Sequence, residues 1–365
     1  MLILNRRFVL AVLGWAIGIF APAGALAHHG SIVNPELYRA ENLVELEGEV
    51  TAIFWRNPHP RFKLSVVNES KEETIWELEM NGSINGYRRM GIGATDIVQV
   101  GDQIKVAGFI SKIETASLGV LHMLLTNGRE FVNGRNRELR WSTQRMAGEF
   151  QDLDVSTVEA AKQSADGVFR VWANVQEPGI KPAEYEPFFT DKGRQLAAAY
   201  DPLKDNYELD CTQGMPETMF DRGSPMEIVN QGERILIHLQ EYDVERVIHM
   251  NAQNTQMEKE LSPLGYSEGK WEGNTLVVNT TGVSWAYYDE VGIPQSEQVS
   301  YSERFSASDD GNLLSYQITI NDPVVFTKPY VRESSRKWEP GRQVELFNCT
   351  PQWEGVEGIA TQFKK

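Results

Sequence analysis

The stretch that decides the fold is residues 43–55, with the sequence LVELEGEVTAIFW. Apolar or small side chains recur at every second position, which is typical of a β-strand with one buried face. Further short strands are predicted at residues 61–67, 74–80, 98–109, 118–125 and 129–132. The turn Asn127-Gly128 joins the last two as a hairpin. With one short helix at residues 84–90, this pattern predicts a small OB-like β-barrel.

The second half of the chain is also rich in short apolar segments separated by turns. Strands are predicted at residues 168–172, 226–229, 234–239, 244–250, 275–280, 299–306, 313–320 and 343–349. A short helix is expected at residues 190–200, capped by Thr190. This spacing favours a larger antiparallel sheet that curls or closes into a barrel. No phosphate loop or G-x-G-x-x-G motif is present, so we expect no nucleotide cofactor.

The predicted protein is therefore mainly all-β, with a few short helices. We divide the chain into a signal peptide (1–27), a small OB-like barrel (28–132), a polar linker with a short helix (133–166) and a larger antiparallel barrel-like domain (167–365). A length of 365 residues is enough for two domains that each bury a core.

Residues 1–27 have the pattern of a secretory signal peptide. Arg6 and Arg7 precede an apolar run, and the segment ends in Ala-Leu-Ala. The alternative is a membrane anchor, but the run is shorter than the roughly 20 residues a spanning helix needs. Both the general secretory and the twin-arginine route remain open. We expect a periplasmic protein of a Gram-negative type of bacterium, with no membrane span after cleavage and with His28 as its first residue.

The charge and the cysteine content restrict the partners and the compartment. The chain has 35 basic and 51 acidic residues, a net charge of −16, which argues against nucleic acid or anionic lipid as the main partner. Two cysteines are too few for a disulfide scaffold or a zinc ribbon. In an oxidising compartment we expect a disulfide between Cys211 and Cys349. The alternative is two buried free thiols.

Three histidines suggest a copper site at the mature N-terminus. Cleavage would leave His28 with a free α-amine next to its imidazole, and His29 follows directly. Nitrogen ligands in tetragonal geometry favour Cu(II). His59 is the candidate third protein ligand, because prolines on both sides hold it in a rigid turn. The alternative is a frayed polar terminus and an ordinary turn histidine.

The sequence identifies no catalytic residue. No nucleophile elbow is present, and paired carboxylates in so acidic a chain are usually solvated. Aromatic residues could instead line a ligand pocket in the second domain, and the candidates are Trp271, Trp285 and Tyr287. Large aromatic side chains normally fill protein cores, so core packing is the alternative.

Two resemblances cover most of the chain after the leader. The His-His start, the pattern Gly48-x-Val50 followed by Trp55, and residues 57–59 (Asn-Pro-His) resemble a family of exported bacterial domains of unknown function. The second half resembles a companion domain of similarly exported, uncharacterised bacterial proteins. Its marks are residues 214–216 (Gly-Met-Pro), 225–229 (Pro-Met-Glu-Ile-Val), 271–278 (Trp-Glu-Gly-Asn-Thr-Leu-Val-Val), 303–305 (Glu-Arg-Phe) and 322–323 (Asp-Pro).

Neither resemblance implies an activity. The chain also departs from the companion pattern at Tyr266, Asn274 and Asn279, where His, Asp and Asp are expected, and at residues 251–253, where an Asp-Gly-Arg turn is expected. If those residues were catalytic or metal-binding in relatives, this chain lacks them. We therefore predict an exported binding or accessory protein, with copper at its mature terminus and a small molecule or metal as its ligand. The alternatives are a periplasmic enzyme acting on a small apolar or aromatic compound in the second domain, and a structural interaction module.

Overall fold

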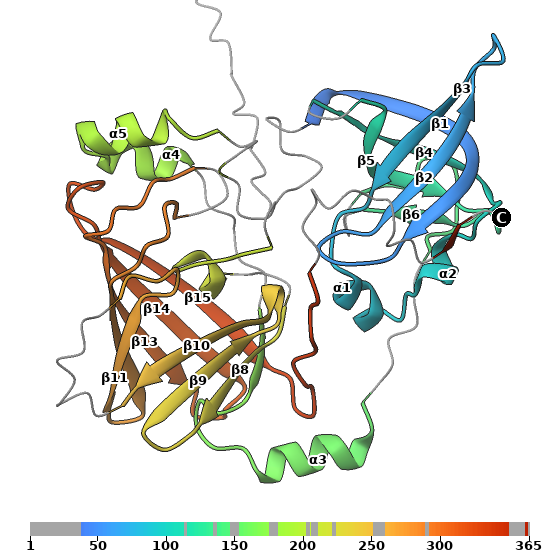
Figure 1. Cartoon of the computed structure of the whole chain (residues 1–365). Coiled ribbons are helices and arrows are strands. Elements are labelled where there is room, and N and C mark those ends of the chain that lie inside the picture. The colour runs from blue at the N-terminus through green and yellow to red at the C-terminus, as the bar shows by residue number, and fades with distance from the viewer. Residues whose placement is uncertain are drawn as a thin grey trace, which may run out of the picture.

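The computed structural model describes residues 38–112, 115–133, 137–146, 153–174, 182–201, 205, 211–220, 224–250, 260–288, 292–349 and 362–363. Its main strands form two sheets, which Figure 1 shows as a blue-to-teal body and a yellow-to-orange body. The described part of the chain is mainly β with a few short helices, which confirms the predicted fold class.

The first sheet closes on itself. Its strands are β1 (Tyr38–Phe54), β2 (Arg61–Val67), β3 (Glu73–Glu79), β4 (Gln103–Ser111), β5 (Ser117–Leu124), β6 (Glu130–Val132) and β16 (Gln362–Phe363). The pairing runs from β1 to β2, β3, β5 and β4, and β4 returns to β1. The pair β3–β5 is parallel, and α1 (Ile84–Arg89) and α2 (Ala94–Ile97) connect β3 to β4. This strand order agrees with the predicted OB-like barrel.

At two positions of this barrel, neighbouring strands lie so close together that only glycine fits. The long strand β1 pairs with β4 along its first part and with β2 along its second. Near the change of partner, a Cβ on Gly48 would lie 2.1 Å from the carbonyl oxygen of Ser65. A Cβ on Gly108 would lie 2.0 Å from the carbonyl oxygen of Gly119. Glycine is required at both points because any side chain would push the neighbouring strand away.

The second sheet is a closed barrel of nine strands. They are β7 (Val171–Asn174), β8 (Met226–Asn230), β9 (Arg234–Leu239), β10 (Val244–His249), β11 (Tyr266–Glu272), β12 (Thr275–Thr281), β13 (Ser300–Ala307), β14 (Leu313–Asn321) and β15 (Tyr330–Trp338). An odd number of strands cannot close with every neighbour antiparallel. Here β10 and β11 form the parallel pair. Trp172, Phe305 and Tyr316 are among the fully buried side chains of its core.

A charged pair also lies inside this barrel. Arg246 and Glu303 are 1% and 0% exposed, and two guanidinium nitrogens contact the two carboxylate oxygens. Arg246 also donates to Ser267 and Thr280, and the hydroxyl of Tyr316 donates to Glu303 at 2.8 Å. The network joins five neighbouring strands from β10 to β14, and its hydrogen bonds offset the cost of burying two charges.

The helices described outside the first barrel are short. They are α3 (Val155–Gln163), α4 (Pro182–Tyr185), α5 (Asp191–Ala197) and the 3-10 turns Glu186–Phe188, Glu217–Phe220 and Glu241–Asp243. The helix expected at residues 190–200 is α5, and the hydroxyl of Thr190 caps it by accepting from the backbone N–H of Gly193. The 3-10 turn Glu217–Phe220 is buried, and Arg336 of β15 donates to the carbonyl of Met219 within it.

One predicted strand is absent from the structure, and two strands of the larger barrel were not predicted. Residues 343–349 form no strand, because their described hydrogen bonds go mainly to side chains and not to a neighbouring strand. The strands β11 and β15 were not predicted. β15 was missed because its inward positions carry Arg332, Ser334 and Arg336, opposite apolar residues of β14, so the apolar alternation is absent.

Candidate functional site: a pocket at the parallel seam

The larger barrel separates along part of its parallel strand pair. β10 and β11 are paired at Ile248–Ser267 and at His249–Glu268. β11 begins only at Tyr266, after a turn in which the N–H of Gly265 donates to the carbonyl of Ser262. Among the described residues, the chain before this turn does not pair with the start of β10. The two segments therefore diverge at this point.

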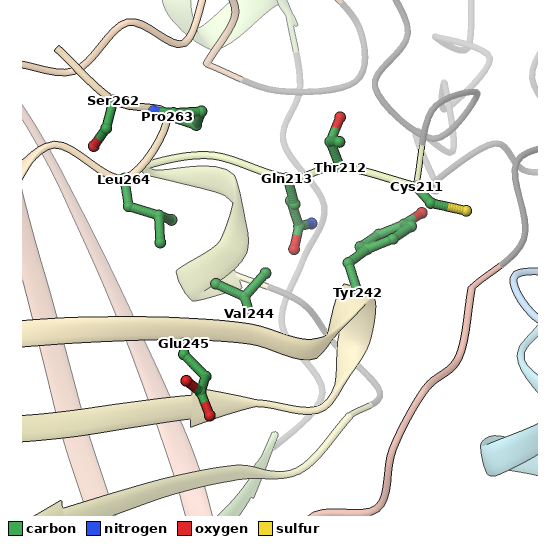
Figure 2. A pocket seen from close by; sticks show the side chains of 9 residues that line it. All are labelled: Cys211, Thr212, Gln213, Tyr242, Val244, Glu245, Ser262, Pro263 and Leu264. Atoms are coloured by element: carbon green, nitrogen blue, oxygen red, sulfur yellow. The ribbon is translucent and has the colours of Figure 1, made fainter.

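A pocket of about 330 Å³ lies where the strands diverge, and we call it the seam pocket. Its lining comes from the start of β10, the residues before β11 and the chain from residue 211 onward (Figure 2): Cys211, Thr212, Gln213, Tyr242, Val244, Glu245, Ser262, Pro263 and Leu264. Ligand pockets in proteins span roughly 300–1,000 Å³. The seam pocket is therefore suited to a small molecule.

Residues 211–213 form one wall of the seam pocket, and Gly214 and Met215 continue the chain behind it. The backbone N–H of Met215 donates to the carbonyl of Pro263 at 3.0 Å, which ties this wall to the residues before β11. On its other side the wall packs against Trp285, because a Cβ on Gly214 would lie 2.4 Å from the Trp285 ring. The absence of a side chain at residue 214 thus allows the wall to sit against the indole.

Gln213 places a polar group in this otherwise mostly apolar lining. Its side chain extends from the wall toward β10, with Leu264 on one side and Tyr242 on the other (Figure 2). The residue is 6% exposed, and neither its amide oxygen nor its amide nitrogen has a hydrogen-bond partner among the described residues. A buried unpaired polar group costs about 1–3 kcal/mol of stability. The unpaired amide of Gln213 therefore lowers the stability of the folded protein.

The seam pocket is connected to a crossing segment, residues 345–349, which passes between the two barrels (Figure 1). The carboxylate of Asp243 accepts from the backbone N–H groups of Phe347 and Asn348, at 2.7 and 3.0 Å. Tyr242 lines the pocket and packs on Phe347, with ring centroids 5.4 Å apart. Cys349 forms the predicted disulfide with Cys211, so the bridge joins the crossing segment to the pocket wall.

The first barrel holds the other side of the crossing segment. Asn57 is completely buried and donates to the carbonyl of Phe347, while its own oxygen accepts from the backbone N–H of Ile84 at 2.8 Å. Asn85 of α1 donates to the carbonyl of Leu346 at 3.1 Å. Asn57 belongs to the motif at residues 57–59. The first residue of that motif thus has a structural role in joining the two barrels.

His59, the last residue of the same motif, contacts Glu79. Its Nδ1 lies 2.7 Å from Oε1 of Glu79, and the hydroxyl of Tyr38 donates to Oε2 of the same carboxylate at 2.8 Å. Burial acts to raise the pKa of Glu79, but the charge of Arg61 and the hydrogen bonds from His59 and Tyr38 lower that pKa to about 2. Glu79 is therefore ionised at neutral pH and orients the imidazole of His59.

The other two predicted copper ligands, His28 and His29, lie outside the described residues. Within the part of the chain that the structure describes, no three His, Cys, Asp or Glu side chains are grouped to hold a metal ion. The copper site therefore stays a prediction.

The three aromatic pocket candidates do not converge. Trp271 is 43% exposed and contacts Phe169 edge to face. The hydroxyl of Tyr287 donates to Asp205 at 3.1 Å, and burial followed by this carboxylate raises the pKa of Tyr287 to about 12. Trp285 lies behind the wall at Gly214. None of the three is among the residues that line the seam pocket.

Gln213 was not predicted as a site residue. A polar residue in a loop has no periodicity that marks it, and its isolation from other polar groups depends on contacts that form only in the folded chain. One signal lay beside it, because Gly214 begins the Gly-Met-Pro run noted in the resemblance.

The fold and the site define a class of protein: two linked β-barrels with a small pocket at the parallel seam of the larger one. Residues 19–118 match a family of unknown function, DUF6152. This range contains the His28-His29 pair and the motif at residues 57–59. No curated protein and no solved structure matches the chain. None of the helices in the described ranges is both long and apolar enough to cross a membrane.

Proposed function

We propose that this protein is an exported binding protein that holds a small, mostly apolar molecule in the seam pocket. The observation that carries this proposal is the pocket itself, which is placed between two diverging strands of a closed barrel. Export rests on the leader-like residues 1–27. A pocket of this size with apolar walls and few polar groups is the usual form of a small-molecule site.

The chemistry of the lining supports binding better than catalysis. The described lining residues include Val244, Pro263 and Leu264 but no His, Lys or Arg. Cys211 is bonded to Cys349 and is not available as a thiolate nucleophile. The polar groups at the pocket are suited to orienting a ligand.

The test is a calorimetric titration of the processed protein with toluene, a small neutral apolar probe. We expect binding by the wild type and loss of binding in Leu264→Trp, whose indole would fill the pocket. The matched control is Leu261→Trp, because Leu261 is 50% exposed on the same loop and does not line the pocket. Equal binding by both variants would place the toluene elsewhere, and no binding by the wild type would contradict the proposal.

A second proposed function is Cu(II) binding by the mature N-terminus together with His59. The observation that favours it is the contact between His59 Nδ1 and the ionised Glu79. Metal-binding histidines commonly donate one ring nitrogen to a carboxylate, which fixes the tautomer and leaves Nε2 for the metal. Glu79 is held in turn by Tyr38 and Arg61, so it suits this orienting role.

This proposal is tested by titrating the processed protein with Cu(II) and following the electron spin resonance signal. We expect weaker binding when a Met precedes His28, because the free α-amine is then displaced, and weaker binding in His59→Ala. Affinity should also fall as the pH drops through about 6.5, the reference pKa of histidine. His238→Ala in β9 is the control and should bind normally. Identical binding by all forms would contradict the site.

A further inference from the structure

We propose that the seam pocket selects neutral ligands that carry a primary carboxamide or an equivalent adjacent donor and acceptor, which pair with the side-chain amide of Gln213. This inference rests on the proposed binding function and names the chemical class of the ligand. Its starting point is the unpaired amide of Gln213 in the lining of the pocket.

The amide of Gln213 fixes the kind of hydrogen bonding that a ligand must supply. It offers one acceptor oxygen and two donor hydrogens side by side. A second carboxamide is complementary to it, because the two groups exchange a pair of N–H to oxygen bonds. The terminal torsion of glutamine is soft, so the shielded amide can turn toward the cavity without leaving its rotamer. A ligand carboxamide would supply one donor and one acceptor, and thus the two hydrogen bonds that the amide of Gln213 lacks in the described structure.

The charges around the pocket exclude anions. Glu245 lines the pocket and is exposed, no described lining residue is cationic, and the whole chain carries a net charge of −16. A ligand carboxylate would meet this negative field and would leave the oxygen of Gln213 without a donor. An ammonium or amidinium ligand has only donors and would leave the amide hydrogens of Gln213 unpaired.

The remainder of the ligand must be apolar and compact. Leu264 and Val244 flank Gln213, and Tyr242 closes the other side (Figure 2). A pocket of about 330 Å³ accepts a single ring with one or two small substituents. Benzamide has this shape, and toluene and benzoate differ from it mainly at the substituent. Comparing the affinities of benzamide and toluene measures the effect of hydrogen bonding, and comparing benzamide and benzoate measures the effect of charge. Toluene alone measures how well the apolar ring fits.

The experiment measures the affinities of benzamide, toluene and benzoate for the processed wild type and for Gln213→Met. Methionine keeps the length of the side chain and removes both hydrogen-bonding groups. We expect the wild type to bind benzamide about tenfold more tightly than toluene, as two neutral hydrogen bonds would allow. Gln213→Met should lose this preference, so that benzamide and toluene bind it with about equal affinity. Benzoate should bind more weakly than benzamide to the wild type.

Failure of the amide pairing and failure of the binding function would give different results in this experiment. Equal affinities for benzamide and toluene in both proteins would overturn the amide pairing and leave a general apolar pocket. No binding of any probe to the wild type would overturn the binding function itself. Thermal unfolding without ligand confirms that the variant folds, and Gln213→Leu is the replacement if Gln213→Met does not. A melting temperature at or above that of the wild type is expected, because an unpaired buried amide is removed.

Discussion

Asn57 and His59 belong to one short motif, yet their side chains have different surroundings. Asn57 is buried against α1 and the crossing segment, whereas the imidazole of His59 contacts the carboxylate of Glu79 in β3. The imidazole of His59 makes it a candidate metal ligand from the sequence alone, whereas no contact of Asn57 is predictable from the sequence. Asparagine is common in turns, and its partner at Phe347 lies almost 300 positions away in the sequence. No local pattern could have revealed that contact.

The ionised state of Glu79 makes the stability of the first barrel depend on pH. The pKa of Glu79 is about 2 in the folded protein, against the usual 4.5 of a glutamate, so its stabilising contribution is complete above pH 4.5 and is lost as the pH falls toward 2. A difference of this size corresponds to roughly 3 kcal/mol. Glu79→Gln should remove this part of the acid sensitivity. Urea unfolding at pH 7, 4 and 2.5 checks it, and the same pH dependence in both proteins would show that another group is responsible.

The buried pair in the larger barrel should respond asymmetrically to substitution. Arg246→Met leaves Glu303 charged and unpaired in the interior, and we expect a loss of about 3–5 kcal/mol. Replacing both residues by Met should recover much of this loss, because no uncompensated charge remains. Chemical denaturation of the three proteins measures both values. A double variant less stable than the single variant would mean that the pair itself, and not the unpaired charge, accounts for the effect.

At the scale of elements, the strands with regular apolar alternation were predictable and the crossing segment was not. The apolar residues at positions 344, 346 and 347 favour a strand over residues 343–349. In the structure the N–H groups of Phe347 and Asn348 go to the carboxylate of Asp243, and the carbonyl of Phe347 goes to Asn57. Side chains of both barrels thus make the hydrogen bonds to this backbone that a neighbouring strand would make in a sheet. The strand β16 also returns to the first barrel and pairs with β1.

Loss of the Asn57 side chain should loosen the crossing segment. Asn57→Ala removes the donor to Phe347 and leaves the N–H of Ile84 without its acceptor, so we expect about 2 kcal/mol of destabilisation. Hydrogen exchange at the amides of residues 345–349 should become faster, while exchange in the strands of the larger barrel stays unchanged. Asn68→Ala is the control, because Asn68 lies in an exposed turn of the same barrel. Unchanged exchange in Asn57→Ala would show that the larger barrel alone holds the segment.

At the scale of the whole molecule, the sequence predicted two β bodies and the Cys211–Cys349 disulfide, but not the seam pocket. Short strands with alternating side chains indicate a barrel even when their partners are unknown. The pocket depends on the parallel pairing of β10 with β11 and on where that pairing stops. Both are properties of the closed barrel. The strand β11 was not predicted at all, since Gly269 and several charged residues interrupt its alternation.

Reduction of the disulfide should affect the stability of the protein and the pocket together. The bridge spans 138 positions, and the chain-entropy relation gives a contribution of about 5 kcal/mol for a loop of this length. We expect a lower melting temperature and weaker toluene binding after reduction, because Cys211 lines the pocket. Cys349→Ser should behave like the reduced protein and should not respond to reductant. A melting temperature that is unchanged by reduction would show that other contacts suffice to hold the crossing segment.

A crystal structure of the processed protein soaked with 4-iodobenzamide would show directly whether the seam pocket binds a ligand. The iodine gives an anomalous signal that locates the ring without bias. We predict one strong peak in the seam pocket, between Val244 and Leu264, with the ligand amide toward Gln213. An empty seam pocket at saturating ligand, or a peak confined to another surface, would contradict the proposal that this pocket is the binding site.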